Sequence, residues 1–362
     1  MHVSHLLIKI FFTVFVLVQG MACQRDATAQ LATDKIRLNQ LGYYPKAEKR
    51  AVVLSDQAKS FTVQDAATGK VVWKGKLGEN RVNQYSKKIS RVADFSELQQ
   101  KGQYVLQVDG MGASHPFEIR EQVHQELAKA ALKGFYYQRV STALTPEFAG
   151  VWARPAAHLD QHIQKHPSAL LDAAVAPTTN PKLHASLASP GGWYDAGDYN
   201  KYIVNSGITM GTLLSLYEDF PTYGQALETH IPESNNALPD LLDEVLWNLR
   251  WMRTMQDPED GGVYHKLTNA QFDGDVMPAQ ANKTRYVVQK SSAATLNFVA
   301  VLAQSARVFK PFEKQLPGLA DSCQQAALRG WTWLQHNPNV LYDQDRINQL
   351  TLPKVVTGAY GD

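Results

Sequence analysis

The hydrophobic pattern of this chain changes its period near residue 120. From residue 33 to residue 119, short apolar runs and alternations such as RAVVLSD, FTVQD and KGQYVLQVDG are separated by turn sequences such as ATGK. Short alternating runs between turns are typical of strands that bury one face. A series of such strands predicts a small all-β sandwich of about 85 residues over 33–119.

After Glu121 the apolar residues recur every three or four positions, as in a helix with one buried face. The clearest segment is LPDLLDEVLWNLRWMRTMQD, residues 238–257, in which Pro239 suits the first helical turn. The same spacing occurs over residues 123–137, 208–217, 291–309 and 323–337. We therefore predict an all-α domain over 121–362. The long segments 146–190 and 257–290 are predicted as loops, and loops of this length are usually functional or disordered.

The first 29 residues have the pattern of an export signal, with Lys9 followed by an apolar run from Ile10 to Val18. The run is too short to span a membrane, which takes about 20 residues. Two release points compete. One is the A-x-A sequence that ends at Ala29, and the other is Cys23, whose position resembles the lipidation site of a bacterial lipoprotein. We expect a periplasmic, secreted or outer-membrane protein, with a lipid on Cys23 as its membrane anchor in the last case.

The net charge and the number of cysteines exclude some binding partners and a disulfide within the chain. The chain has 36 Lys and Arg against 34 Asp and Glu, a net charge of +2, and no basic block that could follow a phosphate backbone. Nucleic acid is therefore not expected as a partner. If Cys23 is removed or lipidated, Cys323 has no partner for a disulfide within the chain. We expect a monomer.

The stretch GGWYDAGDYNKY, residues 191–202, places Asp195 and Asp198 three residues apart among glycines and aromatic residues. Two carboxylates at this spacing can ligate a hard cation or hold one water for attack, but the spacing does not match a calcium-binding EF-hand loop. Aromatic residues offer the flat faces against which a sugar ring packs, and here they are Trp193, Tyr194, Tyr199 and Tyr202. The alternative is that Asp198 caps the helix that follows.

Several segments together resemble the family 9 glycoside hydrolases, the endoglucanases or cellulases, in the subgroup with an N-terminal immunoglobulin-like domain. These segments are RLNQLGYYP, KGQYVLQV, FYYQR, GGWYDAGDYNKY, LLDE, DGGVYHKLT, SSAATLNFVAVLAQSARVF and TGAYGD. The resemblance implies an immunoglobulin-like sandwich followed by an (α/α)6 barrel, here incomplete, that hydrolyses β-1,4-glucosidic bonds in cellulose or related β-glucans with inversion. It also implies that Asp198 is the general base on water and that Asp195 helps to orient this water. His265 resembles a cleft residue that binds sugar hydroxyls, with an ordinary loop histidine as the alternative.

The general acid is expected outside this chain. In the family it is a glutamate in a motif that does not occur before Asp362, and Glu233, Glu244 and Glu259 do not stand in its context. Asp195 and Asp198 are too close in sequence to be an acid and base about 6.5–9.5 Å apart, as inversion requires. We therefore expect a C-terminally truncated fragment that is inactive alone. The alternatives are a non-catalytic carbohydrate-binding or interaction protein, and an exo-acting β-glucosidase or glucosaminidase of the same family.

No cofactor is required by this chemistry. Relatives with this domain pair bind zinc through cysteines at positions that here hold Val140 and Ala157, so no zinc is predicted. His158, His162 and His166 recur every four residues, but Pro167 and the lack of carboxylate partners favour a solvated face. A structural calcium ion could bind Asp273 and Asp275. Four tryptophans at helical positions are predicted in the core: Trp247, Trp251, Trp331 and Trp333.

Overall fold

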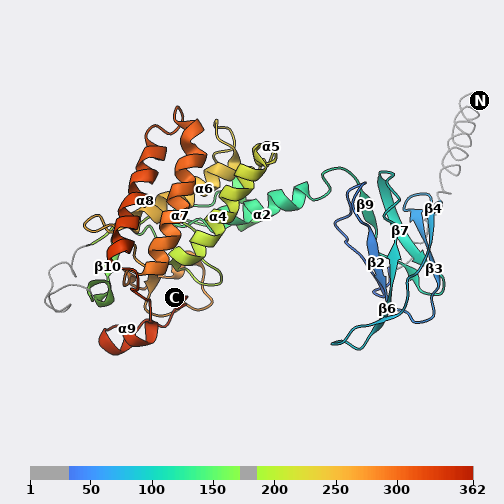
Figure 1. The fold of residues 1–362 in the computed structure, drawn as a ribbon, viewed down its shortest axis with the longest axis horizontal. Helices are drawn as coiled ribbons and strands as arrows, with labels where there is room; N and C mark the ends of the chain where they lie inside the picture. The colour runs from blue at the N-terminus through green and yellow to red at the C-terminus, as the bar shows by residue number, and fades with distance from the viewer. Residues whose placement is uncertain (1–31, 172–185, 362) are drawn as a thin grey trace, which may run out of the picture. The chain divides into compact units, whose positions relative to one another are not determined.

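The computed structural model describes residues 32–171 and 186–361, and it divides between His124 and Gln125 into two compact units (Figure 1). The export signal and Cys23 lie outside the described residues, so export and lipidation stay predictions. Among the residues that are described, no helix is long and apolar enough to cross a membrane.

The first unit consists of two antiparallel sheets around one core. One sheet has the order β1 (Ile36–Arg37), β2 (Arg50–Val53), β6 (Ile89–Asp94), β5 (Arg81–Val82). The other has the order β4 (Val71–Lys76), β3 (Ser60–Asp65), β7 (Gly102–Val108), β8 (Gly112–Ala113), with β9 (Phe117–Ile119) also paired to β7. Val53 of the first sheet and Leu106 of the second are fully buried in the same apolar cluster. The predicted sandwich is therefore confirmed.

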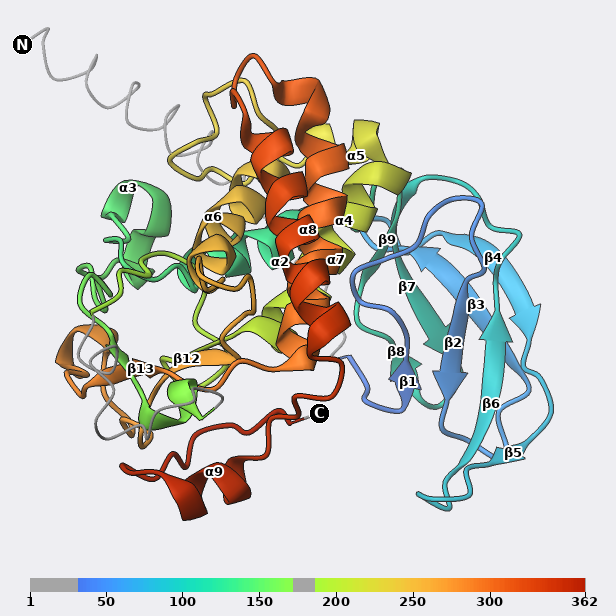
Figure 2. The ribbon, with the colours of Figure 1, turned by 60° about the vertical axis from the view of Figure 1, so that its left-hand side comes forward.

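The second unit is mainly helical. Its α-helices are α2 (Gln125–Tyr137), α3 (Pro146–Ala149), α4 (Ile203–Asp219), α5 (Pro221–Gln225), α6 (Asp240–Thr254), α7 (Ser292–Phe309), α8 (Leu319–His336) and α9 (Gln344–Leu350). Short 3-10 helices are η1 (Gly150–Trp152), η2 (Pro167–Leu170), η5 (Pro278–Gln280) and η6 (Lys310–Phe312). Helices α7 and α8 lie side by side (Figure 2). Pro239 precedes α6 as its N-cap residue rather than lying in its first turn.

The helical unit also contains a small sheet, which the sequence analysis did not predict. Its order is β10 (Gln164–Lys165), β13 (Arg285–Val287), β12 (Lys266–Asn269), β11 (Lys201–Tyr202), drawn from the two segments predicted as loops and from GGWYDAGDYNKY. Strands of two to four residues are too short to show an alternating pattern. In addition, all four residues of β12 are buried although most are polar, which hides the strand from a hydrophobicity pattern.

Candidate active site

Asp195 and Asp198 line one open cavity of about 360 Å³ in the helical unit. Three loops form its wall: residues 195–199, residues 272–275, and the segment that contains Gly358 and Tyr360. Both carboxylates are partly exposed, whereas the adjoining Asn200 and Tyr202 are buried. The pair therefore faces accessible space, as a role in chemistry requires.

Asp198 is not a helix cap, because β11 intervenes and α4 begins only at Ile203 with Tyr202 as its N-cap residue. Its Oδ2 accepts hydrogen bonds from the Tyr202 hydroxyl at 2.7 Å and from Asn200 Nδ2 at 3.0 Å. Its Oδ1 accepts one longer bond, from the Asn200 backbone at 3.4 Å. Oδ1 thus keeps most of its accepting capacity for a water.

Both oxygens of Asp195 are engaged in short hydrogen bonds. Oδ1 accepts from Asn205 Nδ2 at 2.7 Å, and Oδ2 accepts from the Tyr360 hydroxyl at 2.8 Å. The hydrogen bond to Asp195, followed by burial, raises the pKa of Tyr360 and keeps the phenol a donor. Asp195 is therefore a fixed acceptor, while Asp198 has the freer oxygen. Sequence reasoning missed Asn205 and Tyr360, and the terminal TGAYGD motif was the available signal for Tyr360.

The aromatic residues predicted to bind substrate are divided between the cavity and the core. Tyr199 lines the cavity, packs against Tyr194 with ring centroids 5.0 Å apart, and donates its hydroxyl to the Val276 carbonyl. Trp193 is buried and its indole Nε1 donates to Glu244 Oε1 at 2.7 Å, so it does not line this cavity.

The Tyr202 ring is also buried, which makes its predicted stacking on a sugar wrong. Burial, followed by the hydrogen bond to Asp198, raises the pKa of Tyr202 and keeps its hydroxyl protonated as a donor. The residue therefore supports the carboxylate from behind. Phe272, which the sequence did not single out, lines the cavity and is 49% exposed. An exposed aromatic ring of this kind is a better platform for a sugar than either buried ring.

His265 does not line the cavity, and it lies in the bend directly before β12. Its ring is 1% exposed and stacks on Tyr342 with centroids 4.0 Å apart. Nδ1 lies 2.8 Å from Ser291 Oγ, and Nε2 lies 3.0 Å from the Tyr360 carbonyl oxygen. Burial, with a smaller effect from Lys266, lowers the pKa of His265 to about 4. The neutral ring therefore holds the backbone that carries Tyr360.

This lowered pKa predicts a loss of stability in acid. Between about pH 6.5 and pH 4 the unfolded chain binds the proton that folded His265 excludes, so stability falls as pH falls through this window. A difference of this size corresponds to about 3 kcal/mol once both states are protonated. Thermal unfolding measured from pH 7 to pH 4 should show a shallower dependence on pH in His265→Gln than in the unaltered protein. The exposed His336→Gln is the control, and an unchanged slope in His265→Gln contradicts the prediction.

A buried charge cluster holds the loop that carries the two aspartates. The Asp160 carboxylate pairs with Lys201 Nζ at 2.8 Å and with Arg285 Nε at 2.7 Å, and all three side chains are at least 94% buried. Lys201 also donates to the carbonyls of Ser189 and Gly191, and Arg285 donates to that of Tyr199. These hydrogen bonds fix the backbone both before Asp195 and after Asp198.

The pKa values in this cluster agree with an ionised state. Burial raises the pKa of Asp160, but Lys201 and Arg285 more than offset this, and the net pKa lies below its usual value. Burial lowers the pKa of Lys201 to about 8, against the opposing effect of Asp160. At neutral pH one buried carboxylate therefore faces two cations.

None of the glutamates considered as substitute acids lines the cavity. Glu244 is 1% exposed and pairs with Arg139 Nη2 at 2.9 Å, and Glu233 pairs with Nη1 of the same arginine at 3.0 Å. Glu259 is exposed elsewhere in the 257–290 segment. Within the described part of the chain, the cavity therefore has the residues for a base and no glutamate for an acid.

Asp273 and Asp275 line the cavity, and Asp273 Oδ1 is buried with no hydrogen-bond partner and lies 4.0 Å from Lys283 Nζ. Over residues 32–171 and 186–361, no group of three or more His, Cys, Asp or Glu side chains is placed to hold a metal ion. Calcium binding stays a prediction.

The positions relevant to zinc are buried. Val140 and Ala157 lie in the interior, and His158 Nδ1 lies 2.7 Å from the Tyr194 hydroxyl. His166 is fully buried, with Nε2 2.8 Å from the Pro353 carbonyl oxygen, so the predicted solvated face is wrong for this residue. Its burial follows from η2, which packs residues 168–170 into the interior directly after it.

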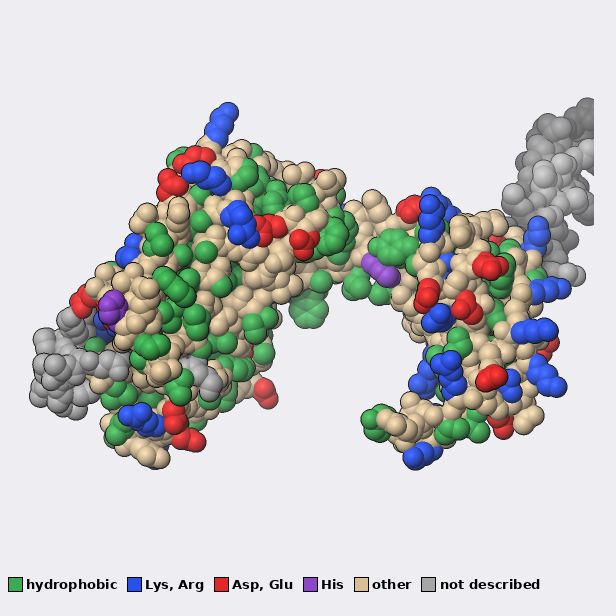
Figure 3. All heavy atoms as spheres, in the orientation of Figure 1, with side chains coloured by type: hydrophobic (Ala, Val, Ile, Leu, Met, Phe, Trp, Pro, Cys, Tyr) green, Lys and Arg blue, Asp and Glu red, His purple; other side chains and the backbone are tan. Residues whose placement is uncertain are grey.

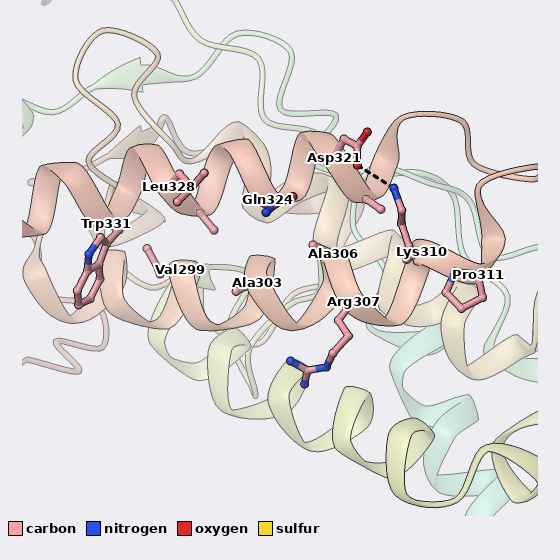
Figure 4. Close-up of a pocket in the computed structure, with 12 residues that line it drawn as sticks. Val299, Ala303, Ala306, Arg307, Lys310, Pro311, Asp321, Gln324, Leu328 and Trp331 are labelled. Carbon is pink, nitrogen blue, oxygen red and sulfur yellow. Dashed lines mark hydrogen bonds and ion pairs between the residues drawn. The ribbon is translucent and has the colours of Figure 1, made fainter.

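A larger hollow of about 690 Å³ lies between α7 and α8, away from the carboxylates (Figure 4). Its wall is mainly apolar, and its one acidic residue, Asp321, pairs with Lys310. Trp331 lines it and is 50% exposed, so the prediction of a core position is wrong for this tryptophan, whereas Trp251 and Trp333 are buried as predicted. This hollow lacks the groups for hydrolysis, and the smaller cavity is the candidate site.

Comparison with known proteins identifies the family. The sequence model for "Glycosyl hydrolase family 9" matches residues 124–362, and that for "Cellulase N-terminal ig-like domain" matches residues 31–113. The chain therefore belongs to glycosyl hydrolase family 9. The predicted family and fold class, an immunoglobulin-like sandwich followed by part of an (α/α)6 barrel, are confirmed.

Two curated relatives and one solved structure show how far the likeness extends. "Xyloglucan-specific endo-beta-1,4-glucanase BoGH9A" from Bacteroides ovatus is 45% identical over 97% of this chain and 59% of its own length. "Endoglucanase D" from Acetivibrio thermocellus is 34% identical over 86% of this chain and 47% of its own. The structure titled "Bacteroides ovatus GH9" superposes with a TM-score of 0.85 at 46% identity, covering 91% of this chain and 58% of that one. The chain thus spans about half to three fifths of the length of these relatives.

Proposed function

We propose that this chain is the base-bearing part of an enzyme that hydrolyses β-1,4-glucosidic bonds with inversion. The observation that carries the proposal is the unequal hydrogen bonding of two carboxylates in one accessible cavity: Asp198 Oδ1 accepts a single long bond, while both oxygens of Asp195 accept short ones. The names of the relatives, a xyloglucan-specific endo-beta-1,4-glucanase and Endoglucanase D, support the substrate class.

In this proposal Asp198 takes a proton from the attacking water through Oδ1. A base must lie within hydrogen-bond reach of the proton it removes, and the Tyr202 and Asn200 donors hold Oδ2 of Asp198 in place while Oδ1 faces the water. Asp195, fixed by Asn205 and Tyr360, accepts the second hydrogen of the same water and sets its direction. The water then attacks the anomeric carbon from the face opposite to the leaving sugar.

The leaving oxygen needs a proton from a general acid on the other side of the sugar, about 6.5–9.5 Å from the base. We propose that a glutamate outside these 362 residues supplies it, since no glutamate among the described residues lines the cavity. The reaction then needs no cofactor, because the base and acid carry both proton transfers.

Residues 272–275, which also line the cavity, support a sugar as the ligand. Phe272 offers an exposed ring against which a sugar face can pack. We propose cellulose, xyloglucan or a related β-1,4-glucan as the substrate.

We also propose that the protein is exported, with Cys23 as a lipid anchor, and acts as a monomer. On the face of the helical unit in Figure 3, acidic and basic side chains are scattered and do not form one basic block, which supports a neutral ligand and not a nucleic acid.

The test compares the complete gene product with residues 1–362 alone, each incubated with soluble cellulose derivatives, mixed-linkage glucan and xyloglucan. The complete protein should release products whose new reducing ends are first α, as ¹H NMR of the anomeric protons reports. Residues 1–362 alone should show less than about 1% of this rate, since a missing acid lowers the rate by about 10²–10⁴-fold. Products that are first β, or equal rates from both proteins, contradict the proposal. Binding without cleavage by the complete protein favours a carbohydrate-binding protein.

A further inference from the structure

Lys266, the first residue of β12, is fully buried, and its ammonium donates hydrogen bonds to acceptors between residues 344 and 358. Nζ donates to the Gly358 carbonyl at 2.6 Å, to Gln344 Oε1 at 2.8 Å and to Thr357 Oγ1 at 3.2 Å. All these acceptors are neutral and lie between residues 344 and 358. Within the described residues no carboxylate lies at ion-pair distance from this ammonium.

The Lys266 ammonium lies near the ring of Tyr202, whose hydroxyl donates to Asp198. Nζ lies 5.6 Å from the centre of the Tyr202 ring and 5.4 Å from that of Tyr342. Burial lowers the pKa of Lys266 to about 7, and the carboxylate of Asp198 opposes this effect. Below this pKa the lysine is therefore a buried cation directly behind the tyrosine that donates to Asp198. A buried charge without an ion partner is destabilising unless its hydrogen bonds hold other groups in place.

The segment that Lys266 contacts, residues 357–358, lies just before Tyr360, which donates to Asp195. Thr357 is also fixed from β12, by a 2.7 Å hydrogen bond between its hydroxyl and that of Thr268. Gly358 lines the cavity, and two residues later the Tyr360 hydroxyl donates to Asp195. The Tyr202 and Tyr360 rings pack edge to face, with centroids 4.7 Å apart. The Lys266 ammonium thus contacts the ring of Tyr202 and the backbone two residues before Tyr360.

We infer that Lys266 is a positioning residue of the two-aspartate site, which holds residues 357–358 so that Tyr360 reaches Asp195, and supports Tyr202 beneath Asp198. The inference rests on the proposed function and deepens it. Lys266 touches neither substrate nor the reacting atoms in this arrangement, so its effect passes through the two tyrosines. A displacement of about 1 Å in such groups can lower a rate by about 100-fold.

The test is Lys266→Met in the complete protein, assayed at pH 6, where the ammonium is largely protonated. We expect kcat on a soluble β-1,4-glucan to fall by about 10- to 100-fold with KM changed less than about twofold, because orientation and not binding is altered. Lys49→Met is the matched control. Lys49 is also fully buried and donates to two backbone carbonyls at 2.7 Å, but it lies in the sandwich unit, so both kinetic constants should stay unchanged.

A second variant and a structure keep the inference testable if Lys266→Met folds poorly. Thr357→Val keeps the side-chain shape but removes the Thr357 hydroxyl, and should lower kcat in the same direction by a smaller factor. The crystal structure of either variant should show the Tyr360 hydroxyl beyond hydrogen-bond distance from Asp195. Retained kcat with Tyr360 still bonded overturns the inference. If the unaltered protein cleaves no β-1,4-glucan, the proposed function fails, and the position of Tyr360 alone decides the role of Lys266.

Discussion

Replacing Asp198 with asparagine in the complete protein is expected to lower kcat on β-1,4-glucan by about 10²–10⁴-fold, the usual contribution of a general base. Asparagine has nearly the same shape and can still accept from Tyr202, but its amide cannot take a proton from water. KM should change little, since the side chain acts on the water and not on the sugar. Initial rates over a range of substrate concentrations, with unfolding temperatures measured in parallel, provide the readout.

The control for this variant is Asp321→Asn on α8. Asp321 is exposed and pairs with Lys310 on the surface, so the same chemical change there should leave kcat unaltered. Asp195→Asn provides a second comparison, because it removes charge from the orienting group while Asp198 remains as the base. If Asp198→Asn keeps more than about a tenth of the activity, a loss smaller than general-base removal usually gives, Asp198 is not the base.

The elements that sequence reasoning located are those with a long repeating pattern. Helix α6 buries Leu241, Leu242, Val245 and Leu249 together with most of its other residues, and the spacing of these apolar residues is visible in the sequence itself. Strands β3 and β7 likewise alternate buried and less buried residues. The strands of the small sheet were missed because pairing between distant segments, and not local pattern, defines them.

Only part of the candidate site could be predicted from the sequence. The DAGD motif indicated both carboxylates, but sequence spacing does not say which neighbouring ring faces the cavity. Tyr202 turns inward because β11 pairs with β12 and buries both of its residues, and His265 is buried where the chain enters β12. Asn205 and Tyr360 approach Asp195 from α4 and from the far end of the chain, and only the folded arrangement brings them together.

The buried cluster around Asp160 escaped prediction for the same reason, since Arg285 lies 125 positions away in the sequence. No local motif marks Asp160, Lys201 or Arg285 as members of one cluster. Yet the cluster fixes the backbone on both sides of Asp195 and Asp198. The stability of the site is therefore expected to depend on a residue that touches neither water nor sugar.

Asp160→Ala is accordingly expected to destabilise the helical unit by about 3–5 kcal/mol, the usual effect of removing one partner from a buried ion pair. Lys201 and Arg285 would be left as buried cations whose mutual repulsion nothing offsets, with side chains 0% and 6% exposed. For a unit of this size, about 2–4 °C per kcal/mol gives a fall in Tm of roughly 6–20 °C. Calorimetry of the complete protein measures the shift.

The matched change is Asp321→Ala, which removes a carboxylate from an exposed pair and should alter stability by about 1 kcal/mol or less. The two variants differ in burial and not in the atoms removed, so their difference isolates the effect of the buried cations. Asp160→Ala should also lower kcat at temperatures well below its Tm, because Tyr199 and Gly191 lose their fixed donors on either side of the aspartates. Equal shifts in Tm for both variants would mean that water reaches Lys201 and Arg285, and the cluster could then not fix the loop.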